Sequence, residues 1–276
     1  MIVHHPFAYS FGAFSFTGFG IAVLLAFVIA QVIAQRELVR RGHNPEPISD
    51  LIFAAVFGGL AGAKIYYVFL TGDIHDLWSR GGFVFWGGLA GGVLAVFLVI
   101  KLKHLNVQRI ADVAGIGIAA AYSMGRTGCW AVGDDYGRPW NSRFAVSFPQ
   151  GAPPSTAGQM AATFHMPIPP GATPSTVLSV YPTQLFEVAL GFIMFAILWR
   201  LRDHKHAEGW LFGVYMVLAG IERFCIEFLR AKDDRFFGVM TMAQLIALAA
   251  VLGGVIWMRA RRTVTERAPG IYATAT

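Results

Sequence analysis

The chain has 276 residues, of which 55% are hydrophobic and 14% charged, and its mean hydropathy is +0.55. Soluble domains carry roughly 25% charged residues, so this composition excludes an ordinary soluble protein and indicates a membrane protein. The formal net charge of +6 is modest and is spread along the loops. This distribution fits the positive charge on the cytoplasmic side of membrane proteins better than a nucleic-acid-binding surface. Two cysteines, Cys129 and Cys225, provide neither a disulfide framework nor a zinc-binding spacing.

Seven apolar runs approach the ~20-residue length that a helix needs to cross a bilayer. They predict an all-α polytopic membrane protein with about seven transmembrane helices, near residues 11–34, 49–70, 82–100, 110–125, 183–198, 210–229 and 240–257. The fourth run is short and interrupted by glycines, so we expect it to be tilted or broken. The loops after the first, third and fifth runs, together with the C-terminal tail, hold 13 arginines and lysines against 7 on the opposite side. This excess predicts the N-terminus outside and the C-terminus inside.

The segment between the fourth and fifth runs, residues 126–182, differs from the other loops. It is polar and carries nine of the thirteen prolines. A loop of this length without strong periodicity is usually functional or disordered. We therefore expect a small external head, residues 126–182, facing the periplasm or cell exterior and inserted into a single membrane domain that covers residues 1–276. Alternating side chains in residues 143–148 predict a short strand within this head.

Residues 125–138, with the sequence GRTGCWAVGDDYGR, place arginines and aspartates between glycines where the fourth run meets water. Each ionisable residue at such depth costs roughly 2.5–3.5 kcal/mol, so such residues usually mark a substrate path or a partner charge. Glycines let a ligand or a neighbouring backbone approach closely, and exposed N–H groups in such turns attract anions. A basic, glycine-rich pocket at a membrane surface suits a phospholipid headgroup.

Other ionisable residues in the apolar runs allow two interpretations each. Arg223 and Glu227 are four residues apart and share one helix face, so they form either a packing ion pair or part of a site. Glu187 faces inward on the fifth run, where its carboxylate pairs with Lys64 or Arg126 or stays protonated. Lys64 lies near the outer end of the second run, where its side chain could also extend along the helix to reach water.

Glycine pairs at residues 58–59, 87–88 and 91–92 are explained by close helix packing in lipid. Trp86 precedes the second pair at the outer end of a run, which favours an interfacial anchor over a chemical participant. Cys129 is interpreted either as a small apolar filler or as a thiol beside the basic residues Arg126 and Arg138.

Five segments taken in order resemble the prolipoprotein diacylglyceryl transferase family, namely residues 62–65, 85–91, 125–138, 181–187 and 223–230. The resemblance covers nearly the whole chain. It implies a seven-span enzyme of the cell inner membrane that moves a diacylglyceryl group from phosphatidylglycerol to the lipobox cysteine thiol of a prolipoprotein, releasing glycerol-1-phosphate. It also implies that no metal or soluble cofactor is used. The implied partners are membrane lipid and the signal peptide of a prolipoprotein, and not nucleic acid.

The resemblance assigns roles position by position. Arg126 matches the signature arginine of the family, Arg223 and Glu227 match its late Arg/Glu pair, and Asp134 stands where the signature has glutamate; these four are implied as catalytic. The implied substrate-binding residues are Lys64, Trp86, Gly87, Gly88, Cys129, Arg138, Gln184 and Glu187. Several of these depart from the family pattern. Lys64 replaces an arginine, Trp86 a histidine and Cys129 an asparagine; elsewhere Val132 replaces a second asparagine and Tyr181 a second histidine.

Arg126 and Arg223 are expected to clamp the single phosphate of phosphatidylglycerol and to stabilise charge on the departing phosphoglycerol. The acceptor thiol needs a base, since its ordinary pKa is about 8.5. Because Trp86 stands in place of the family's histidine, the candidate bases are Asp134, Glu227, Glu187, His75 and His165. Two alternatives stay open, a catalytically silent relative that binds phospholipid or lipoprotein precursor, and a lipid transferase with another acceptor. A transporter is disfavoured because paired broken helices are not visible in the sequence.

Overall fold

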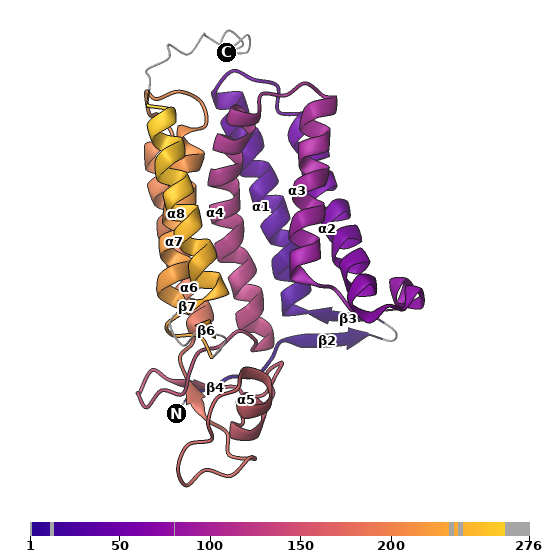
Figure 1. Ribbon diagram of the computed structural model, residues 1–276, viewed down its shortest axis with the longest axis vertical. Helices are drawn as coiled ribbons and strands as arrows, with labels where there is room; N and C mark the ends of the chain where they lie inside the picture. The colour runs from indigo at the N-terminus through magenta and orange to yellow at the C-terminus, as the bar shows by residue number, and fades with distance from the viewer. Residues whose placement is uncertain (1, 12–13, 80, 232–234, 237–239, 263–276) are drawn as a thin grey trace. The chain divides into compact units, whose positions relative to one another are not determined.

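A computed structural model of the protein describes residues 2–11, 14–79, 81–231, 235–236 and 240–262. Its long helices each overlap one of the seven predicted runs (Figure 1). They are α1 (Gly18–Arg40), α2 (Pro47–Thr71), α3 (Phe85–Leu102), α4 (Val107–Val132), α6 (Thr183–Leu201), α7 (Trp210–Ile226) and α8 (Met242–Ala260).

Two boundaries differ from the prediction. The fourth run was expected to be tilted or broken and to end at residue 125, but α4 continues without interruption to Val132. More than half of the glycine-rich motif, residues 125–132 of 125–138, is therefore helical. At the N-terminus, the described residues 11 and 14–17 are not helical. They belong to an antiparallel pair, β2 (Ala8–Phe11) and β3 (Phe14–Thr17), and α1 begins directly after it.

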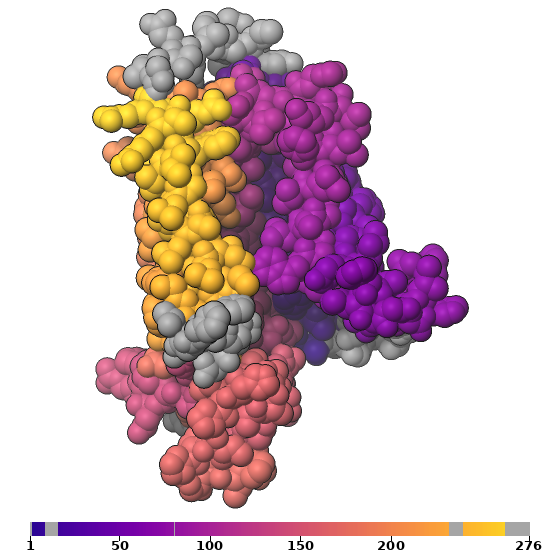
Figure 2. All heavy atoms as spheres, viewed as in Figure 1, coloured from indigo at the N-terminus to yellow at the C-terminus, as the bar shows by residue number. Residues whose placement is uncertain are grey.

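Five helices in the described part of the chain, α1, α2, α3, α6 and α8, are long and apolar enough to cross a membrane. The protein is thus a mainly helical, multi-pass membrane protein. Figure 2 shows the outer face of α8, whose exposed apolar side chains include Leu245, Leu252 and Ile256, as contact with lipid requires. The predicted orientation rests on a count of arginines and lysines on the two sides. Three of the residues in that count, Arg80, Lys232 and Arg267, lie outside the described residues.

The described part of the chain divides into two compact units, the first formed by residues from 2–30 and 114–262 and the second by residues from 31–113. In the second unit α2 and α3 lie side by side (Figure 1). A Cβ atom on Gly62 would collide with the carbonyl oxygen of Gly87, and one on Gly88 would come within 3.3 Å of the Gly59 carbonyl. The small residues at these positions therefore permit close packing of α2 against α3, because a larger side chain would separate the two helices.

In the first unit α7 lies beside both α6 and α8. The N-terminal segment is tied to the end of α4 by a hydrogen bond that the Phe7 N–H donates to the Ala131 carbonyl oxygen at 2.8 Å. A second short antiparallel pair, β6 (Arg235–Phe236) and β7 (Met240–Thr241), precedes α8.

The second unit also contains a short 3-10 helix, η1 (Ile74–Trp78), between α2 and α3.

Residues 133–182, which follow α4 within the predicted head, contribute to a small sheet and an apolar core. Strand β4 (Val146–Ser147) lies between β1 (Ile2–Val3), which is parallel to it, and β5 (Ser179–Val180), which is antiparallel. The predicted strand at residues 143–148 is thus present but only two residues long. Beside the sheet is α5 (Ala157–Phe164). The core includes Tyr136, Phe148 and Met160, and the rings of the first two stack at 5.3 Å.

Candidate active site

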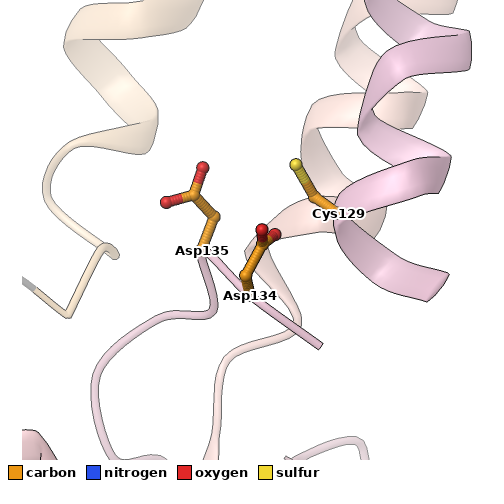
Figure 3. Close-up of side chains that lie close together, drawn as sticks. All are labelled: Cys129, Asp134 and Asp135. Carbon is orange, nitrogen blue, oxygen red and sulfur yellow. The ribbon is translucent and has the colours of Figure 1, made fainter. Parts of the chain in front are cut away.

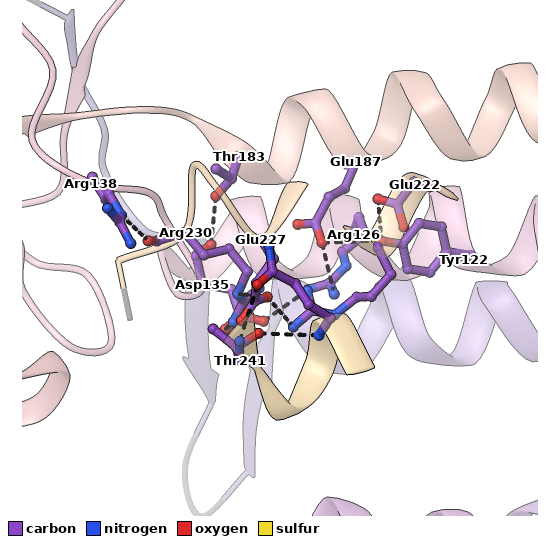
Figure 4. Close-up of polar contacts among 12 residues, drawn as sticks. Tyr122, Arg126, Asp135, Arg138, Thr183, Glu187, Glu222, Glu227, Arg230 and Thr241 are labelled. Carbon is purple, nitrogen blue, oxygen red and sulfur yellow. Dashed lines mark hydrogen bonds and ion pairs between the residues drawn. The ribbon is translucent and has the colours of Figure 1, made fainter. Parts of the chain in front are cut away.

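The carboxylate of Asp135 joins two arginines from distant parts of the chain (Figure 4). Its Oδ2 accepts a hydrogen bond from Arg126 Nη1 at 2.8 Å, and its Oδ1 accepts one from Arg230 Nη2 at 2.6 Å. Its backbone carbonyl accepts a hydrogen bond from Thr183 Oγ1 at 2.7 Å. Asp135 therefore connects the end of α4, the start of α6 and the segment after α7.

Gly137 makes this connection possible at the backbone. Its N–H donates to the Tyr181 carbonyl at 2.8 Å, while the following Arg138 N–H donates to the Leu229 carbonyl at 2.8 Å. A Cβ atom on Gly137 would lie 2.5 Å from the Leu229 carbonyl oxygen and 2.7 Å from the Tyr181 Cβ. Only glycine fits between these two segments without displacing one of them.

Arg126 is held by carboxylates on both sides. Besides Asp135, its Nη2 lies 3.0 Å from Oε1 of Glu187, a fully buried residue of α6. Of the partners considered for Glu187, the structure shows Arg126. The Arg126 Nη1 also lies 3.7 Å from Cys129 Sγ, as expected for a thiol beside this arginine.

A tyrosine extends the cluster into the helices. Tyr122 lies one turn before Arg126 on α4, and its hydroxyl is 3.1 Å from Glu187 Oε1 and 3.0 Å from Glu222 Oε1 of α7. The Arg126 guanidinium lies 5.3 Å from the centre of the Tyr122 ring. Sequence reasoning did not single out Tyr122, Glu222, Asp135 or Arg230. The available signals were the four-residue spacing of Tyr122 from Arg126 and an acidic residue inside an apolar helix.

Arg223 and Glu227 form the ion pair that their spacing predicts, with Nη2 and Oε2 2.6 Å apart. The Glu227 side chain is 1% exposed, whereas that of Arg223 is 31% exposed. Glu227 Oε2 also lies 3.9 Å from Arg230 Nε. Arg223 is the more accessible arginine of the cluster, because its side chain is 31% exposed, against 17% for Arg126 and 14% for Arg230.

Cys129, Asp134 and Asp135 point towards a common space (Figure 3), with their potential ligand atoms within 4.8 Å of one another. A thiolate and two carboxylates could in principle hold a metal ion. However, Asp135 is already paired with Arg126 and Arg230, and two guanidinium charges at this distance oppose a divalent cation. The arrangement fits an ion-pair network better than a metal centre.

The two neighbouring aspartates have opposite electrostatic environments. Burial, reinforced by the charge of Asp135, raises the pKa of Asp134 to about 6. Burial acts in the same sense on Asp135, but Arg230 and Arg126 outweigh it and lower the pKa of Asp135 to about 2. Asp134 is thus the carboxyl group that titrates closest to neutral pH at this end of α4 among the described loop residues.

Several buried oxygen atoms in the cluster have no hydrogen-bond partner among the described residues. They are Asp134 Oδ1, Gln184 Oε1, Glu187 Oε2 and Glu227 Oε1. The Gln184 amide is fixed at its other end, because Nε2 donates to the Asp134 carbonyl at 2.5 Å. Buried acceptors without donors are costly, so this arrangement fits a ligand that brings O–H or S–H groups.

The remaining residues implied by the resemblance have other contacts. Arg138 Nε donates to the Arg230 carbonyl at 3.1 Å. Lys64 Nζ donates to the carbonyls of Ser79, at 2.6 Å, and Gly81, at 2.5 Å, so in the structure this side chain bonds the segment that precedes α3. Trp86 is half exposed at the start of α3, as an interfacial anchor would be. Lys64, Trp86, Gly87 and Gly88 all belong to the second unit.

A family model for prolipoprotein diacylglyceryl transferase matches residues 6–260 of the chain. The protein belongs to the prolipoprotein diacylglyceryl transferase family. This membership confirms the resemblance that was drawn from five sequence segments, and it covers every described residue of the cluster around Arg126 and Asp135.

Curated relatives within this family align over most of their length. A protein of Clostridium tetani is 25% identical over 247 residues, covering 86% of this chain and 90% of that protein. One from Oleidesulfovibrio alaskensis is 28% identical and covers 91% of each chain. One from Xanthomonas oryzae pv. oryzae is 29% identical, covering 96% of this chain and 92% of that protein. All three are named phosphatidylglycerol–prolipoprotein diacylglyceryl transferase.

Proposed function

We propose that this protein transfers a diacylglyceryl group from phosphatidylglycerol to the lipobox cysteine thiol of a prolipoprotein signal peptide and releases glycerol-1-phosphate. Membership of the transferase family over residues 6–260 and the names of the relatives support this reaction. The observation within the site that carries it is the juxtaposition of an accessible arginine, Arg223, with buried oxygen acceptors that lack donors.

The phosphate of the lipid is bound first by Arg223. Its guanidinium uses Nη2 for Glu227 and remains partly exposed, so it can add a charge-assisted bond to a phosphate oxygen. In the structure both Nη atoms of Arg126 are occupied by carboxylates, Nη1 by Asp135 and Nη2 by Glu187. Arg126 therefore binds the phosphate by releasing one of these two partners. This order refines the expectation of two free arginines acting as a clamp.

The buried oxygen atoms without hydrogen-bond donors can accept hydrogen bonds from O–H and S–H groups of the two substrates. Phosphatidylglycerol has two free hydroxyl groups on its headgroup glycerol, and the second substrate has a thiol. Asp134 Oδ1, Gln184 Oε1 and Glu187 Oε2 can accept such hydrogen bonds. Lipids without headgroup hydroxyls would leave these buried acceptors unpaired, which gives a physical basis for headgroup selection.

Asp134 is the base that the loop geometry favours. A carboxylate with a pKa of about 6 is ionised at neutral pH and still takes a proton more readily than an ordinary aspartate. In the transfer step the thiol proton moves to Asp134 as the sulfur forms a bond to the terminal glyceryl carbon. The bond between that carbon and the phosphate oxygen breaks, and glycerol-1-phosphate leaves with the electron pair. Glu187 and Glu227 hold arginines and are less available.

Complementation of a conditional strain that lacks its own diacylglyceryl transferase tests the function, with mass analysis of a lipobox reporter. A diacylglyceryl adduct on the reporter cysteine is expected. Its absence, with the protein verified in the membrane, would favour the catalytically silent relative, and an adduct on another acceptor would favour the second alternative.

Arg126→Ala tests the site in the same assay. The loss of this arginine should lower transfer by about 10²–10³-fold, the usual cost of removing one group that stabilises developing charge. Arg143→Ala is the matched control, since Arg143 is exposed and its guanidinium lies over the ring of Phe144 at 4.6 Å. Equal transfer by the two variants would contradict the proposed role of Arg126.

We further propose seven spans in the inner membrane, with the N-terminus and the head, residues 126–182, on the periplasmic side and the C-terminus in the cytoplasm. The positive-inside distribution of arginine and lysine supports this orientation. In a chain whose own cysteines are replaced by Cys129→Ser and Cys225→Ser, Asn141→Cys and Lys205→Cys each place a single reporter at an exposed position, one on each of the two proposed sides. A membrane-impermeant maleimide should label the first in intact cells and the second only after permeabilisation; the reverse pattern would invert the topology.

A further inference from the structure

The Tyr122 hydroxyl contacts two carboxyl groups at once. Its oxygen is 3.1 Å from Oε1 of Glu187 on α6 and 3.0 Å from Oε1 of Glu222 on α7 (Figure 4). A tyrosine hydroxyl has one proton, so it can donate to only one of them. The other contact is either a repulsion between lone pairs or a hydrogen bond donated to the tyrosine oxygen by a protonated carboxyl group.

The neighbours of the two carboxyl groups decide which one is ionised. Glu187 Oε1 is 3.0 Å from Nη2 of Arg126, whose guanidinium is always charged, so Glu187 is the carboxylate. Glu222 forms no ion pair with any lysine or arginine in the described part of the chain. The adjacent Arg223 instead directs its Nη2 to Glu227.

Burial leaves Glu222 little alternative to holding a proton. Its residue is 9% exposed and lies within an apolar helix. The other titratable or charged groups around it are Tyr122, Glu187, Arg126, Arg223 and Tyr215. An ionised carboxylate without an ion-pair partner in such surroundings is strongly unfavourable, and the usual outcome is neutralisation by a proton.

We propose that Glu222 is a protonated positioning residue whose O–H donates to the Tyr122 oxygen, so that Tyr122 donates to Glu187 and Glu187 accepts from Arg126. This chain of hydrogen bonds joins α7, α4 and α6. It orients Glu187 Oε1 towards Arg126 and leaves Glu187 Oε2 buried without a described hydrogen-bond partner. The protonation of Glu222 and the hydrogen-bond chain do not depend on the proposed function. Only the effect of Glu222 on the transfer rate rests on it.

Infrared absorption of protonated carboxyl groups tests the protonation directly, in purified protein at about pH 7. The wild-type spectrum should contain a protonated-carboxyl band that Glu222→Gln removes. Glu46→Gln, at an exposed glutamate in the loop before α2, is the matched control and should leave the band unchanged. A wild-type band that Glu222→Gln does not alter, or no band at all, would overturn the proposal whether or not the protein transfers lipid.

Transfer kinetics test the positioning role. Glu222→Leu and Tyr122→Phe each remove one donor and should lower kcat about tenfold, the rate equivalent of one hydrogen bond. Glu222→Gln retains an N–H donor and should restore most of the rate lost in Glu222→Leu, with an unchanged pH profile. If Glu222→Gln is as slow as Glu222→Leu, Glu222 acts as an ionised group and the proposal fails.

Discussion

Arg126 and Asp135, nine residues apart around the end of α4, are joined by a hydrogen bond of 2.8 Å from Nη1 to Oδ2. The second oxygen of the same carboxylate accepts from Arg230. One negative charge thus separates two guanidinium groups, and its removal would leave them facing each other.

Asp135→Asn should therefore destabilise the protein. The substitution keeps the shape of the side chain but removes the charge that binds Arg126 and Arg230. Because the Asp135 side chain is 39% exposed, we expect a decrease of about 2 kcal/mol in the free energy of unfolding, within the range for hydrogen bonds to charged groups. Thermal unfolding in detergent micelles measures the effect.

Asp134→Asn provides a control with the same change of charge one residue earlier. Asp134 forms no ion pair with an arginine among the described residues, so this variant should be at least as stable as the wild type at neutral pH. A larger loss from Asp134→Asn than from Asp135→Asn would show that the two carboxylates have been assigned the wrong roles.

The stability of the protein should depend on pH through Asp134. Its pKa is raised from 3.8 in the unfolded chain to about 6 in the folded protein, so the folded state binds the proton more tightly. This contribution is fully present below 3.8 and is lost as the pH rises through about 6. The melting temperature of Asp134→Asn should match that of the wild type near about pH 4 and exceed it near about pH 8. A constant difference across this window would argue against the raised pKa.

Asp135 should behave in the opposite sense. Its lowered pKa of about 2 gives stability that is present above 3.8 and is lost only as the pH falls through about 2. In an Asp134→Asn background, which removes the titration that Asp135 influences, the decrease in melting temperature caused by Asp135→Asn should therefore stay constant between about pH 5 and pH 8.

Gly137→Ala tests the close backbone approach beside the cluster. The added methyl group would overlap the Leu229 carbonyl oxygen and the Tyr181 Cβ, at a cost of roughly 1–3 kcal/mol typical of overpacking. Gly125→Ala is the control within the same motif, because a Cβ atom there meets nothing within 4 Å and the site is helical. Equal melting temperatures for the two variants would contradict the described packing.

Lys64→Met tests whether Lys64 holds the segment between α2 and α3. The side chain bonds the carbonyls of Ser79 and Gly81, so its loss should speed proteolysis of residues 72–84. Lys64→Arg should largely retain protection, since arginine also donates to carbonyl oxygens. If neither variant changes the cleavage rate, Lys64 does not anchor this segment.

The sequence by itself determined the long helices and the family. Apolar runs of about membrane length are a local property, and each overlaps one helix of the structure. The Arg223–Glu227 pair was also predictable, because residues four apart meet on any helix. The unbroken path of α4 through the glycine-rich motif was not, since glycine is compatible with both a helix and a break.

Only the tertiary structure decided which charges meet. The sequence offers Arg126 two adjacent carboxylates, Asp134 and Asp135, and the turn after α4 directs the second one towards it. Tyr122 meets Glu187 and Glu222 across 65 and 100 residues, because three helices present one side chain each to the same place. Such contacts follow from the rotation of each helix about its axis, which neighbouring helices set and which no local pattern in the chain records.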